Sequence, residues 1–366
     1  MFLFKMAANV GSLLTAVLRC LRSSAFRKKK KFQFRKMNFV RTTRVGHKEN
    51  ILALDINTDG ILSSVAEDGH CILWSTDGQI LHDINVNNEH GLTSDEYPLN
   101  SVTFNPSDGN KFYISSGMQV LVYDMRKCSA YLTKFDLNED EINQLCVNST
   151  GRYLAACDDL GEIKVIDIQE SRLFKTLGRR HDNICSSVQF RHKKSWQLLS
   201  AGLDCNIINW DFSSGKPQQI FNMNDHILKQ TEGNQTSFIN PPFVHSLSVA
   251  KDGKTFATGL GNGEIGLFQF QGKLSTCTER LKCHDSEVSQ VYYFNFGSTE
   301  RCLVSGGNDG KINIWKEIQT GKNVKYELYH KILHDSKINW ITCSSFKKDC
   351  VFVADQYSNV TVYELK

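Results

Sequence analysis

Histidine, serine and aspartate residues recur in this chain at spacings that could carry nucleophilic chemistry. His47 is followed by Ser63 and Ser64 and then by Asp68, a set that could supply the base, nucleophile and orienting carboxylate of a hydrolase. The same types return twice, as His181 with Asp204 and as His284 with Asp309. One active site needs one triad, and no nucleophile elbow accompanies any of these sets. The repetition therefore favours a structural role over a catalytic one.

Two other groupings could bind a cofactor or a metal. Gly261, Gly263 and Gly266 have the spacing of a dinucleotide fingerprint, but the strand-like LFQFQ follows them where a helix is required. Cys277 and Cys283 lie close to His284, but no CxxC pair and no fourth ligand is near. We therefore predict no catalytic residue, no cofactor and no metal site.

The elements that must position these residues are short strands at near-regular intervals. Seven segments of β-branched and aromatic residues end at a large apolar residue, 43 to 58 residues after the one before. The seven marker residues are Trp74, Tyr123, Ile166, Trp210, Phe268, Trp315 and Tyr363. A period of this length holds about four short strands, which is typical of a β-propeller.

Three of the repeats carry an aspartate six residues before a tryptophan, and a histidine upstream. The pairs are Asp68 with Trp74, Asp204 with Trp210 and Asp309 with Trp315. The upstream histidines are His47, His181, His245, His284 and His334. With this pattern the chain resembles the WD40-repeat family, in which His, Asp, Trp and a Ser or Thr form a buried hydrogen-bond network in each blade.

The resemblance implies an all-β protein with the fold of a seven-bladed WD40 β-propeller. The nine residues expected in its blade networks are His47, Asp68, Trp74, His181, Asp204, Trp210, His284, Asp309 and Trp315. The other repeats are degenerate. Gly117 and Asn262 occupy the aspartate position in the second and fifth repeats, and Asp159 and Asp355 lie at longer offsets in the third and seventh.

The seventh repeat ends with its marker strand, and one strand is left over at the other end of the chain. Residues 38–45 (NFVRTTRV) are strand-like and precede His47 without a blade of their own. We expect them to close the ring as the outer strand of the seventh blade, because a closed ring leaves no open edge. Two polar stretches, 222–242 and 316–332, are expected to be insertions between blades.

The first 36 residues differ from the rest, which we assign as the propeller domain, 37–366. Residues 1–36 contain ten Lys and Arg and no acid, which leaves 33 basic and 39 acidic residues, a net charge of −6, for the remainder. The leader has three interpretations: a mitochondrial presequence, a membrane-surface or nuclear-import segment using Arg27 to Lys31, or a disordered and dispensable extension before Met37. Its apolar part is too short to span a membrane.

The acidic balance of the propeller domain argues against nucleic-acid binding. The twelve cysteines are scattered without CxxC pairs, as expected of free thiols in a reducing compartment. We therefore expect a monomeric intracellular protein of the cytoplasm or the nucleus, with mitochondrial targeting by residues 1–36 as the alternative, and other proteins as its partners.

One rim motif indicates a specific partner. Tyr123-Asp124-Met125-Arg126 resembles the Trp-Asp-x-Arg box of WD40 proteins that serve as substrate receptors of cullin-four RING ubiquitin ligases. The resemblance implies that Asp124 and Arg126 contact the damage-binding adaptor of these ligases. The alternatives are an ordinary solvated arginine and a scaffold in an unrelated protein complex.

Overall fold

The computed structural model describes residues 38–89, 98–225, 240–296, 300–320 and 323–366. The chain divides into two units, 1–36 and Met37–Lys366, and the second is described here. The interpretations of residues 1–36 therefore lie outside the described residues.

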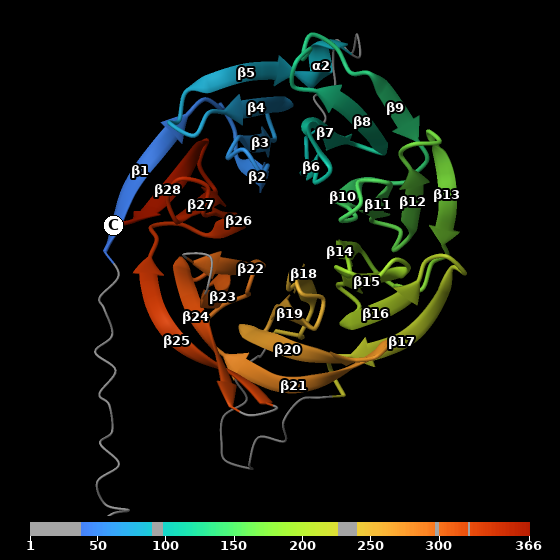
Figure 1. Cartoon of the computed structure of the whole chain (residues 1–366), viewed down its shortest axis with the longest axis vertical. Coiled ribbons are helices and arrows are strands. Elements are labelled where there is room, and N and C mark those ends of the chain that lie inside the picture. The colour runs from blue at the N-terminus through green and yellow to red at the C-terminus, as the bar shows by residue number, and fades with distance from the viewer. Residues whose placement is uncertain (1–37, 90–97, 226–239, 297–299, 321–322) are drawn as a thin grey trace, which may run out of the picture. The chain divides into compact units, whose positions relative to one another are not determined.

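The second unit consists of seven four-stranded antiparallel sheets arranged as a ring (Figure 1). Blade 1 contains β2 (Ile51–Ile56), β3 (Leu62–Ala66), β4 (His70–Trp74) and β5 (Ile80–Asn85). Blade 2 contains β6 (Val102–Asn105), β7 (Asp108–Ser116), β8 (Gln119–Asp124) and β9 (Thr133–Asp136). Blade 3 contains β10 (Ile142–Val147), β11 (Tyr153–Asp158), β12 (Ile163–Asp167) and β13 (Arg172–Leu177). Blade 4 contains β14 (Cys185–Phe190), β15 (Gln197–Gly202), β16 (Asn206–Asp211) and β17 (Lys216–Asn222).

The remaining blades follow the same order from the axis of the ring outwards. Blade 5 contains β18 (Val244–Val249), β19 (Thr255–Leu260), β20 (Glu264–Gln271) and β21 (Leu274–Lys282). Blade 6 contains β22 (Gln290–Phe296), β23 (Glu300–Gly306), β24 (Lys311–Thr320) and β25 (Asn323–Leu333). Blade 7 contains β26 (Ile338–Ser344), β27 (Cys350–Asp355), β28 (Asn359–Leu365) and β1 (Phe39–Val45). Within the described ranges the only helix is α2 (Val86–Glu89). The seven-bladed all-β fold is confirmed, and each marker residue lies on the third strand of its blade.

Closure of the ring follows the prediction made for residues 38–45. β1 pairs antiparallel with β28 over its whole length, from Phe39 opposite Leu365 to Val45 opposite Asn359. The amide of Lys366 also donates a hydrogen bond to the carbonyl of Asn38, at 2.9 Å. The last blade therefore contains strands from both ends of the propeller domain.

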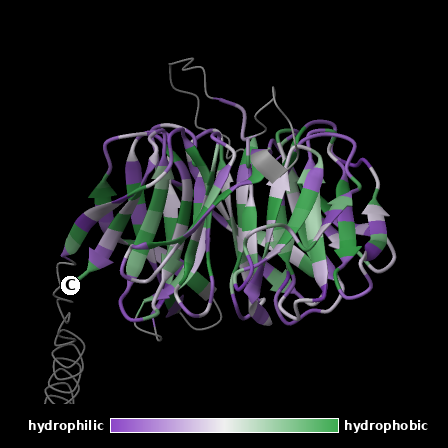
Figure 2. Ribbon diagram, turned by 90° about the horizontal axis from the view of Figure 1, so that it is seen from above, coloured by the Kyte–Doolittle hydropathy of each residue, from purple (hydrophilic) through white to green (hydrophobic). Residues whose placement is uncertain are grey.

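The hydrophobic core lies between blades rather than within one. Apolar residues are spread along the strands of the blades (Figure 2), and β3, β11 and β15 are buried along their whole length, so both faces of these sheets pack against neighbouring blades. Seven buried clusters result, one at each blade interface; that between blades 7 and 1 brings Trp74 and Leu62 against Phe352 and Val362. The marker tryptophans Trp74 and Trp210 are each 1% exposed, and Trp315 is 8% exposed, as predicted.

A buried arginine adds a polar joint between blades 4 and 5. The Arg191 side chain donates from Nε to the carbonyl of Gly253 at 2.8 Å and from Nη1 to the carbonyl of Gly272 at 2.7 Å. Its guanidinium stacks on the Phe270 ring, 3.6 Å from the ring centroid. Burial lowers the pKa of Arg191, and the acceptors for Nε and Nη1 are uncharged: these two carbonyls and the side-chain oxygen of Gln197.

The structure corrects one expected insertion. Residues 316–320 and 323–332 do not bridge two blades, because they continue β24 and form β25, the paired third and fourth strands of blade 6. The pairing runs from Lys311 opposite Leu333 to Thr320 opposite Asn323. The predicted insertion was therefore wrong, because the polar residues of this outer strand have the composition of a loop. In the other stretch, 222–242, Asn222 ends β17 and residues 226–239 lie outside the described part of the chain.

Candidate functional site

The first repeated set of polar residues forms a buried network inside blade 1. Ser64 Oγ lies 2.7 Å from His47 Nε2 and accepts a hydrogen bond from Trp74 Nε1 at 2.8 Å. His47 Nδ1 lies 3.2 Å from Asp68 Oδ1. Burial alone would raise the pKa of Asp68, but hydrogen bonds from His47 and from the amide of Lys48 outweigh it and hold the pKa at about 2. The serine hydroxyl is occupied on both sides, so it serves the fold rather than a reaction.

Blades 4 and 6 repeat this geometry. His181 lies 3.0 Å from Asp204 and 2.8 Å from Ser200, which accepts from Trp210 Nε1 at 2.8 Å. In blade 6 the distances are 2.8 Å from His284 to Asp309, 2.9 Å from His284 to Ser305 and 3.1 Å from Trp315 Nε1 to Ser305. The structure thus brings all nine network residues together in three sets. Ser200 and Ser305 were missed, although a serine ten residues before each tryptophan is a readable signal.

The degenerate blades differ from the expected pattern. In blade 7, His334 contacts Asp355 at 2.8 Å and the hydroxyl of Tyr363 at 2.9 Å, so one tyrosine replaces the serine and tryptophan. In blade 3 the buried aspartate is Asp158, not Asp159; it accepts from Asn138 Nδ2 at 2.9 Å at the end of β11. His245 does not belong to a network either, because it lies on β18 and lines the central channel.

The Tyr-Asp-x-Arg motif forms a fork at the end of β8. Arg126 donates from Nε to Asp124 Oδ1 at 2.9 Å and from Nη2 to Oδ2 at 2.6 Å, and its backbone amide donates to Oδ1 at 2.9 Å. The fork lowers the pKa of Asp124 to about 2, so the carboxylate is ionised. The Arg126 side chain remains 67% exposed, while Tyr123 is fully buried and stacks on Phe112 with centroids 5.4 Å apart.

Comparison with known sequences agrees with the fold and with the networks. The family described as "WD domain, G-beta repeat" matches residues 38–75 and 275–316, ranges that contain the networks of blades 1 and 6. The chain therefore contains WD40 repeats in these two ranges. It is similar to the WD repeat-containing protein 53 homolog of Dictyostelium discoideum, with 28% identity over 367 residues, which cover 90% of this chain and 95% of that protein. WD40 propellers are in general non-enzymatic scaffolds for protein interaction, and the fold supports that role here.

The described residues offer few other kinds of site. No group of His, Cys, Asp and Glu side chains in the described ranges could hold a metal ion. Where the structure describes the chain, no helix is long and apolar enough to cross a bilayer. The described cysteines are free thiols, and burial raises the pKa of Cys146, Cys283 and Cys302 to about 12.

The two faces of the WD40 propeller differ in what they carry. First and third strands of a blade are both antiparallel to the second, so they end at the same face. This face carries Arg126 at the end of β8, and we call it the Arg126 face. The opposite face carries His47, His181 and His284 in the loops before the first strands, and we call it the network face.

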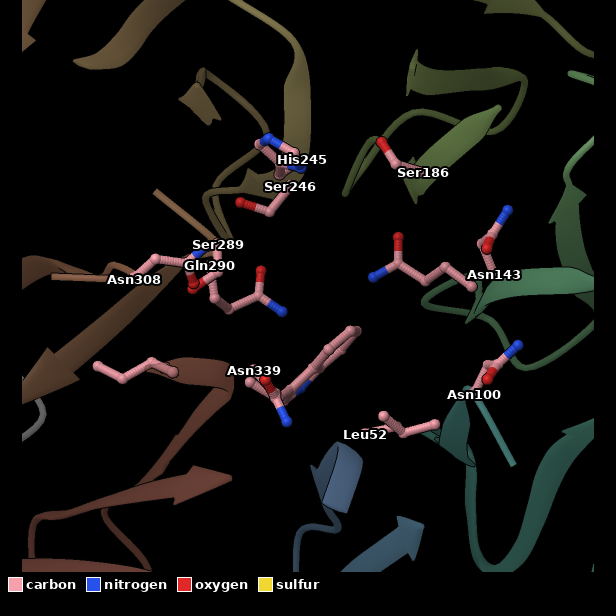
Figure 3. A pocket seen from close by; sticks show the side chains of 13 residues that line it. Leu52, Asn100, Asn143, Ser186, His245, Ser246, Ser289, Gln290, Asn308 and Asn339 are labelled. Carbon is pink, nitrogen blue, oxygen red and sulfur yellow. The ribbon is translucent and has the colours of Figure 1, made fainter. Parts of the chain in front are cut away.

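A polar cavity of about 350 Å³ opens the central channel at the network face (Figure 3). One residue from each innermost strand or the loop before it surrounds the cavity: Leu52, Asn100, Asn143, Ser186, His245, Ser289 and Asn339. Most of these polar groups already hold the ring together. Asn100, Asn143, Ser186 and Asn339 each donate to a carbonyl of the next blade. This cavity therefore keeps few groups for a ligand.

A second cavity, of about 320 Å³, lies on the side of the channel toward the Arg126 face. We call it the lower vestibule. Seven residues form its inner wall, each three positions further along the chain than the residue of the same blade that surrounds the first cavity: Asp55, Thr103, Cys146, Gln189, Ser248, Tyr292 and Thr342. Gln144, Gln290 and Trp340 line both cavities and so lie between them.

Asp55 contributes a carboxylate to this vestibule. Its Oδ2 accepts from the amide of Phe104 in blade 2 at 2.8 Å, and its Oδ1 accepts from the amide of Ile56 at 2.8 Å. Burial raises the pKa of Asp55 to about 6, and these hydrogen bonds only partly oppose the rise. Desolvation, and after it the negative charge of Asp55, raises the pKa of the Tyr292 hydroxyl in the same wall.

Proposed function

We propose that this WD40 propeller is a substrate receptor of a cullin-four RING ubiquitin ligase and that Arg126 contacts the damage-binding adaptor. The observation that carries the proposal is the fork between Arg126 and Asp124 on a rigid rim. The fork occupies Nε and part of Nη2, while Nη1 makes no hydrogen bond within the described residues. The guanidinium is held in place before a partner arrives, which reduces the entropy lost on binding.

The departure from the Trp-Asp-x-Arg box leaves this geometry intact. Tyr123 stands where the box has tryptophan, and it is buried at the end of the third strand like Trp74 and Trp210. Its role in the motif is to anchor the strand end, while the Asp and Arg that follow form the exposed part. The substitution of Tyr for Trp therefore does not weaken the proposal.

The proposal includes an intracellular location, in the cytoplasm or the nucleus, where such ligases act. Free thiols in the described part of the chain support it, because several lie buried in strands as small apolar residues. A scaffold in an unrelated protein complex is the alternative that the following experiment separates.

Affinity capture of the full chain with a C-terminal tag tests the adaptor contact. Wild type is compared with Arg126→Ala and with Arg152→Ala, a matched control. Arg152 also forks onto a carboxylate, that of Asp167, at 3.1 and 2.9 Å, and its side chain is 44% exposed, but it lies outside the motif. We expect Arg126→Ala alone to lose the adaptor, by about thirtyfold or more if Arg126 is an interface hot spot.

Two results contradict the proposal. The adaptor is absent from the wild-type capture, or it is lost equally with Arg152→Ala, which would indicate a general effect of surface charge. Circular dichroism and thermal melting of each variant establish that the blades remain folded.

A further inference from the structure

The carboxylate of Asp55 has no structural need for its charge. It accepts an amide hydrogen from the next blade, and this bond joins blades 1 and 2. In blade 5, Ser248 stands at the same register and accepts from the amide of Tyr293 in blade 6 at 2.9 Å. A neutral hydroxyl thus makes the same joint without the desolvation that a buried carboxylate suffers.

Among the described residues Asp55 forms no ion pair. Two basic residues, Lys251 and His192, are among those that line the vestibule, and neither forms an ion pair with Asp55 within the described ranges. Lys251 lies exposed on its outer rim, and burial lowers the pKa of His192, which keeps that imidazole neutral at physiological pH. An uncompensated carboxylate in a cavity is a typical mark of a ligand site.

The rest of the lower vestibule suits a cation on an apolar stem. Tyr292 and Trp340 line it with aromatic rings, which attract cations through their faces. Gln189 supplies an amide oxygen that can accept a hydrogen bond from an ammonium or guanidinium group, whereas the amide oxygen of Gln144 already accepts from Ser187 Oγ and from the amide of Val188. At about 320 Å³ the vestibule is at the small end of ligand cavities, so it suits one long side chain rather than a folded segment.

We propose that the lower vestibule receives the side chain of a lysine or arginine from a protein partner, with Asp55 as the counter-ion and Tyr292 and Trp340 as the walls around its stem. The vestibule opens between exposed rim residues, Thr58 and Ser149 among them, on the Arg126 face. A partner docked on that face can insert one side chain along the axis of the ring. The site is independent of the adaptor contact, because Arg126 lies on the rim of blade 2 and not in the vestibule.

Capped amino acids test this site on the full chain without any knowledge of the partner. The probes are N-acetyl-lysine methylamide, N-acetyl-arginine methylamide and the neutral N-acetyl-norleucine methylamide. Binding is followed by fluorine NMR on protein labelled with 5-fluorotryptophan, with the Trp340 signal assigned from Trp340→Phe. We expect saturable shifts of the Trp340 signal with a cationic probe and none with the norleucine derivative.

Asp55→Asn is the decisive variant, because the amide oxygen can still accept from the Phe104 amide. We expect it to weaken cation binding by about tenfold to a hundredfold, the range of a lost charge-assisted hydrogen bond. Asp59→Asn is the matched control, because Asp59 is exposed on the turn that follows the same strand and does not line the vestibule.

Each of three results would overturn the proposal: no shift with either cationic probe, equal shifts with the norleucine derivative, or an equal loss of binding in Asp59→Asn and Asp55→Asn. Retained cation binding in Arg126→Ala is expected, and it shows that this site does not depend on the adaptor contact.

Discussion

The carboxylate of Asp55 should make the propeller less stable at neutral pH than it would be with a neutral side chain. Burial raises its pKa in the folded protein from 3.8 to about 6. Each tenfold change in proton affinity corresponds to about 1.4 kcal/mol, so the ionised carboxylate lowers the free energy of unfolding by about 3 kcal/mol at pH 7.5. Asp55→Asn removes this penalty while keeping an acceptor for the Phe104 amide.

The sign of the effect follows from proton binding. Between the unfolded and folded pKa values, 3.8 and about 6, the folded state binds more protons than the unfolded state at this residue. The destabilisation is therefore complete above about pH 6, and it fades as the pH falls toward the pKa of Asp55 in the unfolded chain. The gain in unfolding free energy of Asp55→Asn over wild type should be about 1–3 kcal/mol at pH 7.5, because the asparagine bonds are weaker, and about 1.4 kcal/mol smaller than that at pH 5.

Urea unfolding followed by tryptophan fluorescence at pH 5, 6 and 7.5 measures this difference. Asp59→Asn serves as the control and should lie within about 0.5 kcal/mol of wild type throughout, as expected for an exposed side chain. The reasoning is refuted if Asp55→Asn is less stable than wild type at pH 7.5, or if its advantage does not shrink at pH 5.

Three other perturbations test the packing of the propeller. Trp210→Phe removes the indole donor to Ser200 and leaves a small cavity, so the free energy of unfolding measured in urea should fall by about 1–3 kcal/mol. Arg191→Met leaves two carbonyls of blade 5 unpaired and should lower the unfolding free energy by about 2–3 kcal/mol in the same assay. Cys146, whose pKa burial raises to about 12, should react with iodoacetamide at pH 8 more slowly in the native protein than in urea by a factor on the order of 1,000, as measured by peptide mass spectrometry.

The parts of the fold that could be predicted from the sequence depend on local spacing. The turn aspartate, the tryptophan six residues later and the β-branched strand between them are fixed by one hairpin, so three blades could be recognised directly. The closing strand followed from counting strands. The prediction placed the aspartate of blade 3 one residue too late, at Asp159 instead of Asp158, because the turn after β11 differs in length from those after β3 and β15.

The channel could not be predicted, because no local pattern marks it. The lower vestibule takes one residue from each of seven first strands, and these residues are separated by whole repeats. Asp55 and Ser248 share a register position without sharing a motif. His245 was assigned to a blade network on spacing alone, whereas its place on the first strand turns it toward the axis.

The pairing of β1 with β28 also has a consequence for biosynthesis. β1 leaves the ribosome among the first strands, but its partner is made roughly 300 residues later. At about 5–20 residues per second, this strand waits on the order of 15–60 seconds with unpaired amide and carbonyl groups. Six blades can fold during that delay, but an edge that is free to pair with another nascent chain remains until the last residues emerge. Nascent propellers should therefore engage chaperones late in translation, at the moment when the ring is nearly complete and still open.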